Sequence, residues 1–171
     1  KGQSLTFCRV NAHFQNGWAE RQIQELQDHA RTMLVHAHAC WPTAINAHLW
    51  PYALRTANDI FNNMPMLKTQ RVPIQLFADS PVNNDLKNWH YFGCPAYILH
   101  SDLQSGKARD NWADKSRVAI YLGCSPMHVR TVALCLSLMT GLTSLQFHFK
   151  ADPTFQTLHP AFCNQLPQSQ W

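Results

Sequence analysis

Apolar residues in the first third of the chain recur at intervals of three and four. Between Ala19 and Ala37 this spacing predicts an amphipathic helix with one apolar stripe, formed by Ala19, Ile23, Leu26, Ala30, Met33, Leu34 and Ala37. A break is expected at Cys40-Trp41-Pro42, because proline interrupts helical hydrogen bonding. The same period returns from about Leu49 to Asn62 and predicts a second helix. We expect the two helices to pack as neighbours.

The pattern changes in the second half of the chain to a period of two. From Ser144 to Lys150 polar and apolar residues alternate, which predicts a strand whose apolar side chains, Leu145, Phe147 and Phe149, form one buried face. The segment from Val132 to Leu138 is its predicted partner, joined by a short turn that contains Gly141. Two more strands are predicted at residues 96–99 and 118–122.

These patterns together predict an α+β chain. We expect residues 1–63 to be helical and residues 90–155 to form a small antiparallel barrel or sheet. Residues 64–89 show no sustained period and contain three prolines, so we interpret them as a linker. Residues 156–171 are predicted to be a poorly ordered tail. A length of 171 residues suits one compact domain or two small ones.

Composition narrows the class of protein only a little. The formal net charge of +4, with ten further histidines, permits a nucleic-acid partner without requiring one. No run of about 18 apolar residues occurs, so we expect no membrane partner and a soluble, non-secreted protein. Because the first residue is Lys1 and not Met, the chain is expected to be cut from a longer protein.

The six cysteines are far apart and form no CxxC pair, so we expect most of them to be reduced and buried. His36, His38 and Cys40 invite a zinc interpretation. Second neighbours on a helix point to opposite sides, however, and no fourth ligand follows at finger spacing, so zinc is not favoured. Three tryptophans are expected in the core or between the two parts of the chain: Trp41, Trp50 and Trp89.

Glu20 lies in the first turn of the long predicted helix and allows two interpretations. With Gly17 as the N-cap, its carboxylate would accept a hydrogen bond from the cap N–H and would be favoured by the helix dipole. Alternatively, Glu20 is a metal ligand for phosphodiester chemistry, which uses two divalent cations about 3.5–4 Å apart. Mg²⁺ and Mn²⁺ prefer such oxygen ligands. No Asp or Glu precedes Glu20, so a site of several acids is incomplete in this chain.

The segment Asn11-Ala12-His13-Phe14-Gln15-Asn16-Gly17-Trp18-Ala19-Glu20-Arg21 is similar to the third-acid segment of copia-type LTR retrotransposon integrases. That family pattern reads Gln, Asn, Gly, a variable residue, Ala, Glu, Arg. Leu49-Trp50-Pro51-Tyr52-Ala53 and Asn62-Asn63-Met64-Pro65 resemble the helix that closes the family's core. Two later segments resemble the SH3-like domain that follows that core: Phe92-Gly93-Cys94-Pro95-Ala96-Tyr97 and Lys115-Ser116-Arg117-Val118-Ala119-Ile120-Tyr121-Leu122-Gly123.

The resemblance spans about residues 8–155 and carries specific expectations. It implies that residues 1–63 are the C-terminal helical part of an RNase H-like catalytic core and that residues 90–155 are an SH3-like domain. Glu20 would be the catalytic and metal-binding glutamate, with two aspartates before Lys1 and Mg²⁺ or Mn²⁺ bound only in the complete core. The missing upstream strands would cover the apolar face of the long helix. The partners would be DNA, both element ends and target, and further copies of the complete integrase.

A polar flank on the long helix supplies candidate nucleic-acid contacts. Helical spacing places Glu20 in line with four other polar residues: Asn16, Gln24, Gln27 and Arg31. These four side chains could contact phosphates or bases near a metal-bound Glu20, and the alternative is an ordinary solvated face.

In the second half of the chain, Lys107, Arg109, Lys115, Arg117, Arg130 and Lys150 outnumber the local aspartates. With Trp112 nearby they are weaker candidates for binding nucleic acid by charge and stacking. The alternative is a mixed surface beside a core tryptophan.

The function expected from the sequence is therefore that of a fragment of a retrotransposon Pol polyprotein integrase. The complete enzyme would bind nucleic acid and integrate DNA by metal-dependent strand transfer, in the nucleus or a virus-like particle. The isolated chain is expected to be inactive. Departures such as Trp18, where a smaller residue is common, leave open a degenerate or domesticated remnant that binds DNA or protein without catalysis. An unrelated helical interaction protein is a further alternative.

Overall fold

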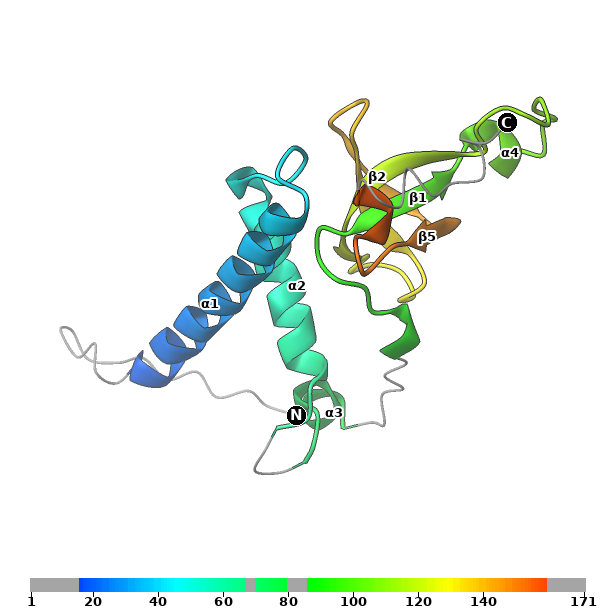
Figure 1. Cartoon of the computed structure of the whole chain (residues 1–171). Coiled ribbons are helices and arrows are strands. Elements are labelled where there is room, and N and C mark those ends of the chain that lie inside the picture. Colours follow the sequence, from blue (N-terminus) through cyan, green and yellow to red (C-terminus); the bar gives the residue numbers. More distant parts are fainter. Residues whose placement is uncertain (1–15, 67–69, 80–85, 160–171) are drawn as a thin grey trace.

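The structure, a computed structural model, describes residues 16–66, 70–79 and 86–159 and has an α+β fold. Two long helices lie side by side, and next to them lies a five-stranded antiparallel sheet (Figure 1). Residues 11–15 of the integrase-like segment and residues 160–171 of the predicted tail lie outside the described residues. Within the described ranges, no helix has both the length and the apolar character needed to cross a bilayer.

Both helices predicted from the period of 3.6 are confirmed. They are α1 (Gly17–Cys40) and α2 (Trp50–Asn63), and a short 3-10 turn, η2 (Ala47–Leu49), leads into the second. Proline lies in the first turn of α2, where its missing N–H breaks no helical hydrogen bond. The buried positions of the pair include small residues on both helices, Ala30 and Ala37 on α1 and Ala53 and Ala57 on α2. Such side chains allow the two helices to approach closely.

The segment predicted as a linker, residues 64–89, contains regular structure of its own. It includes α3 (Pro73–Ala78) and a 3-10 turn, η3 (Leu86–Asn88), and α3 contacts α2. Val72, directly before α3, is buried. A helix of six residues is too short to produce a recognisable hydrophobic period, which is why the sequence did not indicate it.

The predicted strands are present and form one antiparallel sheet in the order β4-β3-β2-β1-β5. The strands are β1 (Pro95–Leu99), β2 (Ser116–Cys124), β3 (Ala133–Ser137), β4 (Thr143–Gln146) and β5 (Phe149–Ala151). A short helix, α4 (Ser101–Gln104), lies in the connection between β1 and β2, and η4 (Gln156–Leu158) follows the last strand.

The strand predicted from Ser144 to Lys150 is in fact two strands at opposite edges of the sheet. β4 pairs with β3, whereas β5 pairs with β1, and only Phe147 and His148 separate them. Leu99 N–H also donates to the His148 carbonyl oxygen at 3.0 Å. Since the chain crosses from one edge to the other within two residues, the sheet must curl until its edges meet.

The inward and outward faces of β4 are the reverse of the prediction. Gln146 is buried, whereas Leu145 is 46% exposed and Phe147 is 60% exposed. Gln146 lies opposite Ala133, and the interior of the curled sheet is lined there by the small residues Ala133 and Cys135. That leaves room for the longer side chain, whose Nε2 donates to Ser144 Oγ at 2.9 Å.

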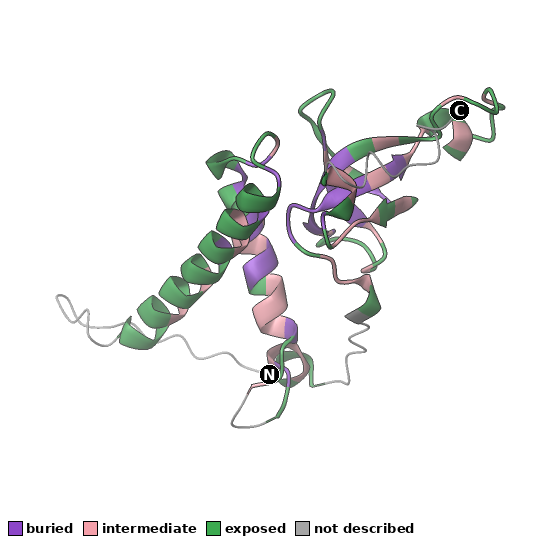
Figure 2. Ribbon diagram, viewed as in Figure 1, coloured by how far each residue is buried: buried purple, intermediate pink, exposed green. Residues whose placement is uncertain are grey.

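One hydrophobic core joins the helices to the sheet. Trp41 and Ile45, after α1, belong to the same buried cluster as Phe92, Cys94 and Phe155 of the β region. The buried residues gather where the two parts meet, while most of α1 is exposed (Figure 2). The sheet is therefore held against the helices by apolar packing.

A glycine permits a close approach between α1 and the β region. Gly93 has φ +79°, and a Cβ added there would lie 2.6 Å from the Ala37 Cβ. Any larger residue would push the chain before β1 away from α1.

The tryptophan and cysteine predictions have mixed outcomes. Trp41 is buried and Trp89 is half-buried, as expected, but Trp50 at the start of α2 is 59% exposed. The prediction for Trp50 is wrong because its side chain lies outside the packed faces of α1 and α2. The four cysteines within the described ranges are free thiols: Cys94 and Cys135 are buried, Cys124 is half-buried and Cys40 is exposed.

Candidate functional site

Glu20 is an exposed carboxylate in the first turn of α1. The N-cap residue is Asn16 and no side chain caps this helix end, so Glu20 is the fourth helical residue. The capping interpretation with Gly17 as N-cap is therefore wrong. Within the described residues Glu20 forms no hydrogen bond or ion pair, which leaves its carboxylate available to a ligand.

The polar flank predicted beside Glu20 is accessible along α1. Asn16, Gln24, Gln27 and Arg31 are all exposed. The nearest ion pair joins Arg21 Nε to Glu25 Oε1 at 3.1 Å, and both of these side chains are also exposed. The flank thus presents amide groups and one arginine beside Glu20, which suits polar contact with a nucleic-acid backbone.

Glu20 can supply one ligand to a divalent cation. In the part of the chain that the structure describes, no three His, Cys, Asp or Glu side chains converge on a possible metal position. Mg²⁺ and Mn²⁺ sites need several oxygen ligands. The described residues therefore fit the role of one contributor to such a site and do not form it alone.

Of the three candidate zinc ligands at the end of α1, His36 and Cys40 lie together, with Nε2 and Sγ 3.9 Å apart, whereas His38 points elsewhere. His38 Nδ1 lies 2.8 Å from the Ile45 carbonyl oxygen. His36 also contacts the rings of Tyr91 and Phe155, at centroid distances of 6.2 and 5.9 Å. The two histidines thus serve different packing contacts on different sides of the helix.

A groove of about 840 Å³ lies between α1 and the segment from Ile45 to Leu54. Gln27 and Arg31 of the polar flank belong to its lining. The rest of the lining is mainly apolar and includes Ala30, Leu34, Val35, Ala47, Trp50 and Leu54. The apolar stripe of α1 is therefore only partly covered by α2.

The second predicted basic region is only partly available for binding. Trp112 is 94% exposed, so the alternative of a core tryptophan is wrong. Its backbone N–H donates to Asp110 Oδ1 at 3.2 Å, and Lys107 and Lys115 nearby are exposed. Arg130 is not in this region, because it is bound elsewhere in the fold.

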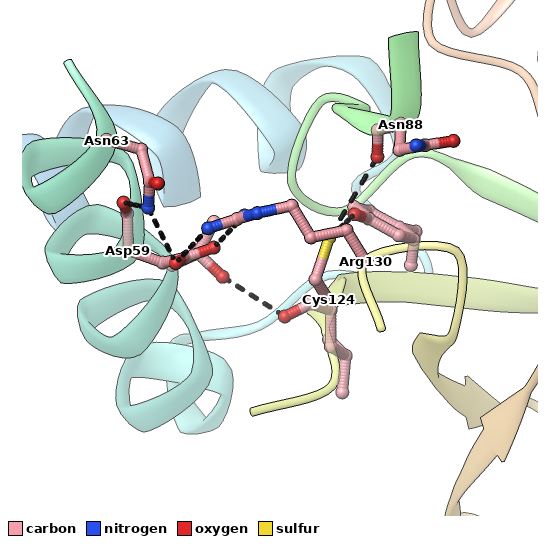
Figure 3. A network of polar contacts seen from close by, with 8 residues as sticks. Asp59, Asn63, Asn88, Cys124 and Arg130 are labelled. Atoms are coloured by element: carbon pink, nitrogen blue, oxygen red, sulfur yellow. Dashed lines mark hydrogen bonds and ion pairs between the residues drawn. The ribbon is translucent and has the colours of Figure 1, made fainter. Parts of the chain in front are cut away.

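Arg130 and Asp59 form a two-point ion pair that joins the β2–β3 connection to α2 (Figure 3). Nη1 lies 3.0 Å from Oδ2 and Nη2 lies 3.2 Å from Oδ1. The guanidinium centre also lies 4.9 Å from the centre of the Trp89 ring, a cation–π contact. Asn63 Nδ2 donates to Asp59 Oδ1 at 3.1 Å and fixes the carboxylate further. We name the pair of Asp59 and Arg130, with Trp89, the clasp.

A buried hydrogen bond supports the same junction. Thr56 Oγ1 on α2 donates to the Leu122 carbonyl oxygen on β2 at 3.1 Å. Gly123 follows with φ +109°, and a Cβ there would lie 2.6 Å from Thr56 Oγ1. Together with the clasp, this contact fixes the sheet relative to α2. No local pattern in the sequence indicates either contact, since the partners are 66 and 71 residues apart.

Comparison of the chain with protein-family models, with curated proteins and with solved structures found no match.

Proposed function

We propose that this chain is the C-terminal part of a copia-type LTR retrotransposon integrase. In the complete enzyme it binds nucleic acid and takes part in DNA integration by metal-dependent strand transfer. Residues 1–63 would be the helical end of an RNase H-like core and residues 90–155 an SH3-like domain. The observation that carries the proposal is Glu20, an exposed carboxylate in the first turn of α1 that has no partner among the described residues, within the segment Asn-Gly-Trp-Ala-Glu-Arg.

The availability of Glu20 supports the metal-ligand role over a capping role. The carboxylate of a capping glutamate accepts a hydrogen bond from a backbone N–H at the start of the helix. The Glu20 carboxylate has no such partner among the described residues. Two bound Mg²⁺ or Mn²⁺ ions would activate the attacking oxygen and stabilise the leaving oxygen. Glu20 would supply one carboxylate ligand to these ions. Three other side chains of α1 would orient neighbouring phosphates: Gln24, Gln27 and Arg31.

The groove beside α1 also supports the proposal. Its apolar lining borders the flank that carries Gln27 and Arg31. Upstream strands of the catalytic core would cover this lining and would bring two aspartates towards Glu20. The curled five-stranded sheet is likewise the coarse architecture expected of a small β domain after the core.

The test is strand transfer by the chain extended upstream to include the two expected aspartates. With Mg²⁺ or Mn²⁺ and a labelled oligonucleotide that ends in the element's terminal sequence, the extended protein should join the oligonucleotide to a target DNA. Glu20→Gln keeps the size of the side chain and removes its charge, so we expect the activity to fall at least about a hundredfold.

Glu25→Gln is the matched control, because Glu25 is an exposed acid on the same helix that pairs with Arg21. It should leave strand transfer unchanged. Activity that survives Glu20→Gln would reject the role of Glu20. An extended protein that binds DNA but never transfers it, with both aspartates present, would favour the degenerate remnant.

A further inference from the structure

Two metal-binding side chains, His36 and Cys40, lie one turn apart at the end of α1. Nε2 of the imidazole is 3.9 Å from Sγ of the thiol, and both residues are exposed. Residues four apart on a helix lie on the same face, so the backbone itself brings the two side chains together. The spacing argument against zinc applies to His38, which is two residues from each of them.

The separation of the two donor atoms suits a single zinc ion. Zinc binds a histidine nitrogen at about 2.0–2.1 Å and a cysteine sulfur at about 2.3 Å in tetrahedral geometry, which places the two donors about 3.6 Å apart. The observed 3.9 Å is slightly longer, and a small rotation of the cysteine side chain closes the difference. Neither donor atom has another hydrogen-bond partner among the described residues, so metal binding breaks no existing bond apart from their own weak contact.

Ring contacts hold the imidazole of His36 in position for a ligand. Its centroid lies 6.2 Å from that of Tyr91 and 5.9 Å from that of Phe155. Phe155 is buried, so the wall on that side of the imidazole is fixed by the core. A side chain that is already oriented loses less conformational entropy when it binds a metal.

The surroundings of the pair favour a cation of intermediate softness. The partial negative charge of the helix dipole lies at the C-terminal end of α1, where the pair lies. The sequence from Thr32 to Asn46 contains no lysine or arginine. Thiolate and imidazole ligands select zinc over Mg²⁺ or Mn²⁺, which prefer oxygen. This pair thus differs in chemistry from Glu20, which is about 24 Å away along α1.

One chain supplies only half of the ligands that a structural zinc ion requires. Such ions are held by four protein ligands, for example two cysteines and two histidines. Among the described residues, no three His, Cys, Asp or Glu side chains gather around a possible metal position. Two copies of the chain related by a two-fold axis would each contribute the same pair and complete the set of four. Residues 38–40 are exposed and Tyr91 is 62% exposed, so the pair is open to a second molecule.

We propose that one Zn²⁺ joins two copies of this chain by binding His36 and Cys40 of each. The two thiols bind as thiolates and release their protons to solvent. A disulfide between two Cys40 residues fits less well, because it leaves His36 without a role and needs an oxidant. The zinc site lies apart from Glu20 and does not depend on the proposed integrase role.

The test is zinc titration of the full 171-residue chain, first stripped of metal and kept in a phosphine reductant that prevents disulfides. Sedimentation velocity should show monomers without zinc and dimers when about half an equivalent of zinc per chain is added. A chelator should restore the monomers. His36→Gln and Cys40→Ser should each weaken the zinc-dependent dimer at least about tenfold, since even the hydrogen-bond partners of metal ligands contribute that much.

His29→Gln is the matched control, because His29 is an exposed histidine on the same helix, about 10 Å along the axis from His36. It should leave the dimer unchanged. Zinc should also slow the modification of Cys40 by iodoacetamide at least about tenfold, as read by peptide mass spectrometry. A chain that stays monomeric with zinc would overturn the proposal. So would a dimer that survives Cys40→Ser, or one that forms while Cys40 reacts at its metal-free rate.

Discussion

Arg130 binds Asp59 through both terminal nitrogens of its guanidinium, at 3.0 and 3.2 Å, although 71 positions separate the two residues. The pair connects the turn before β3 to α2, and Trp89 lies against the guanidinium. Planar, two-point contacts of this kind are stronger than a lysine–carboxylate pair and depend on orientation. The clasp thus fixes both the distance and the rotation of the sheet relative to the helices.

The energy of the clasp can be measured with a double-mutant cycle. We expect Arg130→Ala and Asp59→Ala each to lower the free energy of unfolding by about 1–2 kcal/mol, with a coupling of about 1 kcal/mol between them. These expected losses in the free energy of unfolding are moderate because 25% of the arginine side chain and 38% of the aspartate side chain remain exposed to solvent. Urea denaturation of the wild type, both single variants and the double variant gives the four values.

The matched control for the clasp is the pair of Arg21 and Glu25. It is also an Arg–carboxylate pair, but it lies within one helix and is well exposed. Its coupling should be only about 0.3–0.5 kcal/mol. Equal coupling in both pairs would mean that the clasp does not hold the sheet to α2.

Gly123→Ala should destabilise the junction between α2 and β2. The residue has φ +109°, and its new Cβ would meet Thr56 Oγ1 at 2.6 Å. Backbone strain and overpacking together should cost about 2–4 kcal/mol of the free energy of unfolding. Gly106→Ala provides the comparison, because Gly106 also has positive φ (+76°) but nothing lies near its added Cβ. It should cost only about 1 kcal/mol, and similar losses in both variants would contradict the close approach of Thr56.

His90 should make the fold less stable in mildly acidic solution. Its ring packs edge-on against Tyr121 and Phe149, at 5.4 and 5.7 Å, and this burial lowers the pKa of His90 below 6.5. The unfolded chain then takes up a proton at a higher pH than the folded chain, so the free energy of unfolding falls as pH drops below about 6.5. His90→Phe keeps the aromatic contacts and should weaken this fall between pH 7 and pH 5, measured by urea titrations. An unchanged slope would exclude His90 as its source.

The two buried thiols should resist alkylation and should weaken the fold in alkaline solution. Burial raises the pKa of Cys94 and that of Cys135 to about 12 each, against 9.0 in an exposed thiol. The unfolded chain therefore loses these protons first, and the free energy of unfolding should fall as pH rises above about 9. At pH 8, iodoacetamide should modify the exposed Cys40 and spare the buried pair until denaturant is added, as read by peptide mass spectrometry. Rapid labelling of Cys94 in the native protein would show that the core opens locally.

The sequence predicted the elements whose signal is local. The helical period of α1 continues over 24 residues, and proline near residue 42 marks its end, so both its existence and its approximate limits were predictable. The positions of β1, β2 and β3 followed from short apolar or alternating runs. The place of Glu20 at a helix start was predictable for the same reason, although the N-cap residue was not.

Features that depend on distant partners were not predictable. Alternation in β4 indicates two faces but does not say which face is covered, so Leu145 and Gln146 were assigned to the wrong sides. The break between β4 and β5 at Phe147 exists because the two edges of the sheet meet there. No local sequence pattern indicates that meeting. The same holds for the clasp, since nothing near Arg130 in the sequence points to Asp59.

The contact between His36 and Phe155 has a consequence for synthesis of the chain. The two rings lie 5.9 Å apart, one at the end of α1 and the other after the last strand. Trp41 and Ile45 share their buried cluster with Phe155, so this apolar surface stays open to solvent until almost all described residues have left the ribosome. Exposed apolar surface on an incomplete chain favours aggregation, so the helical part is most prone to aggregate before the β region has been synthesised.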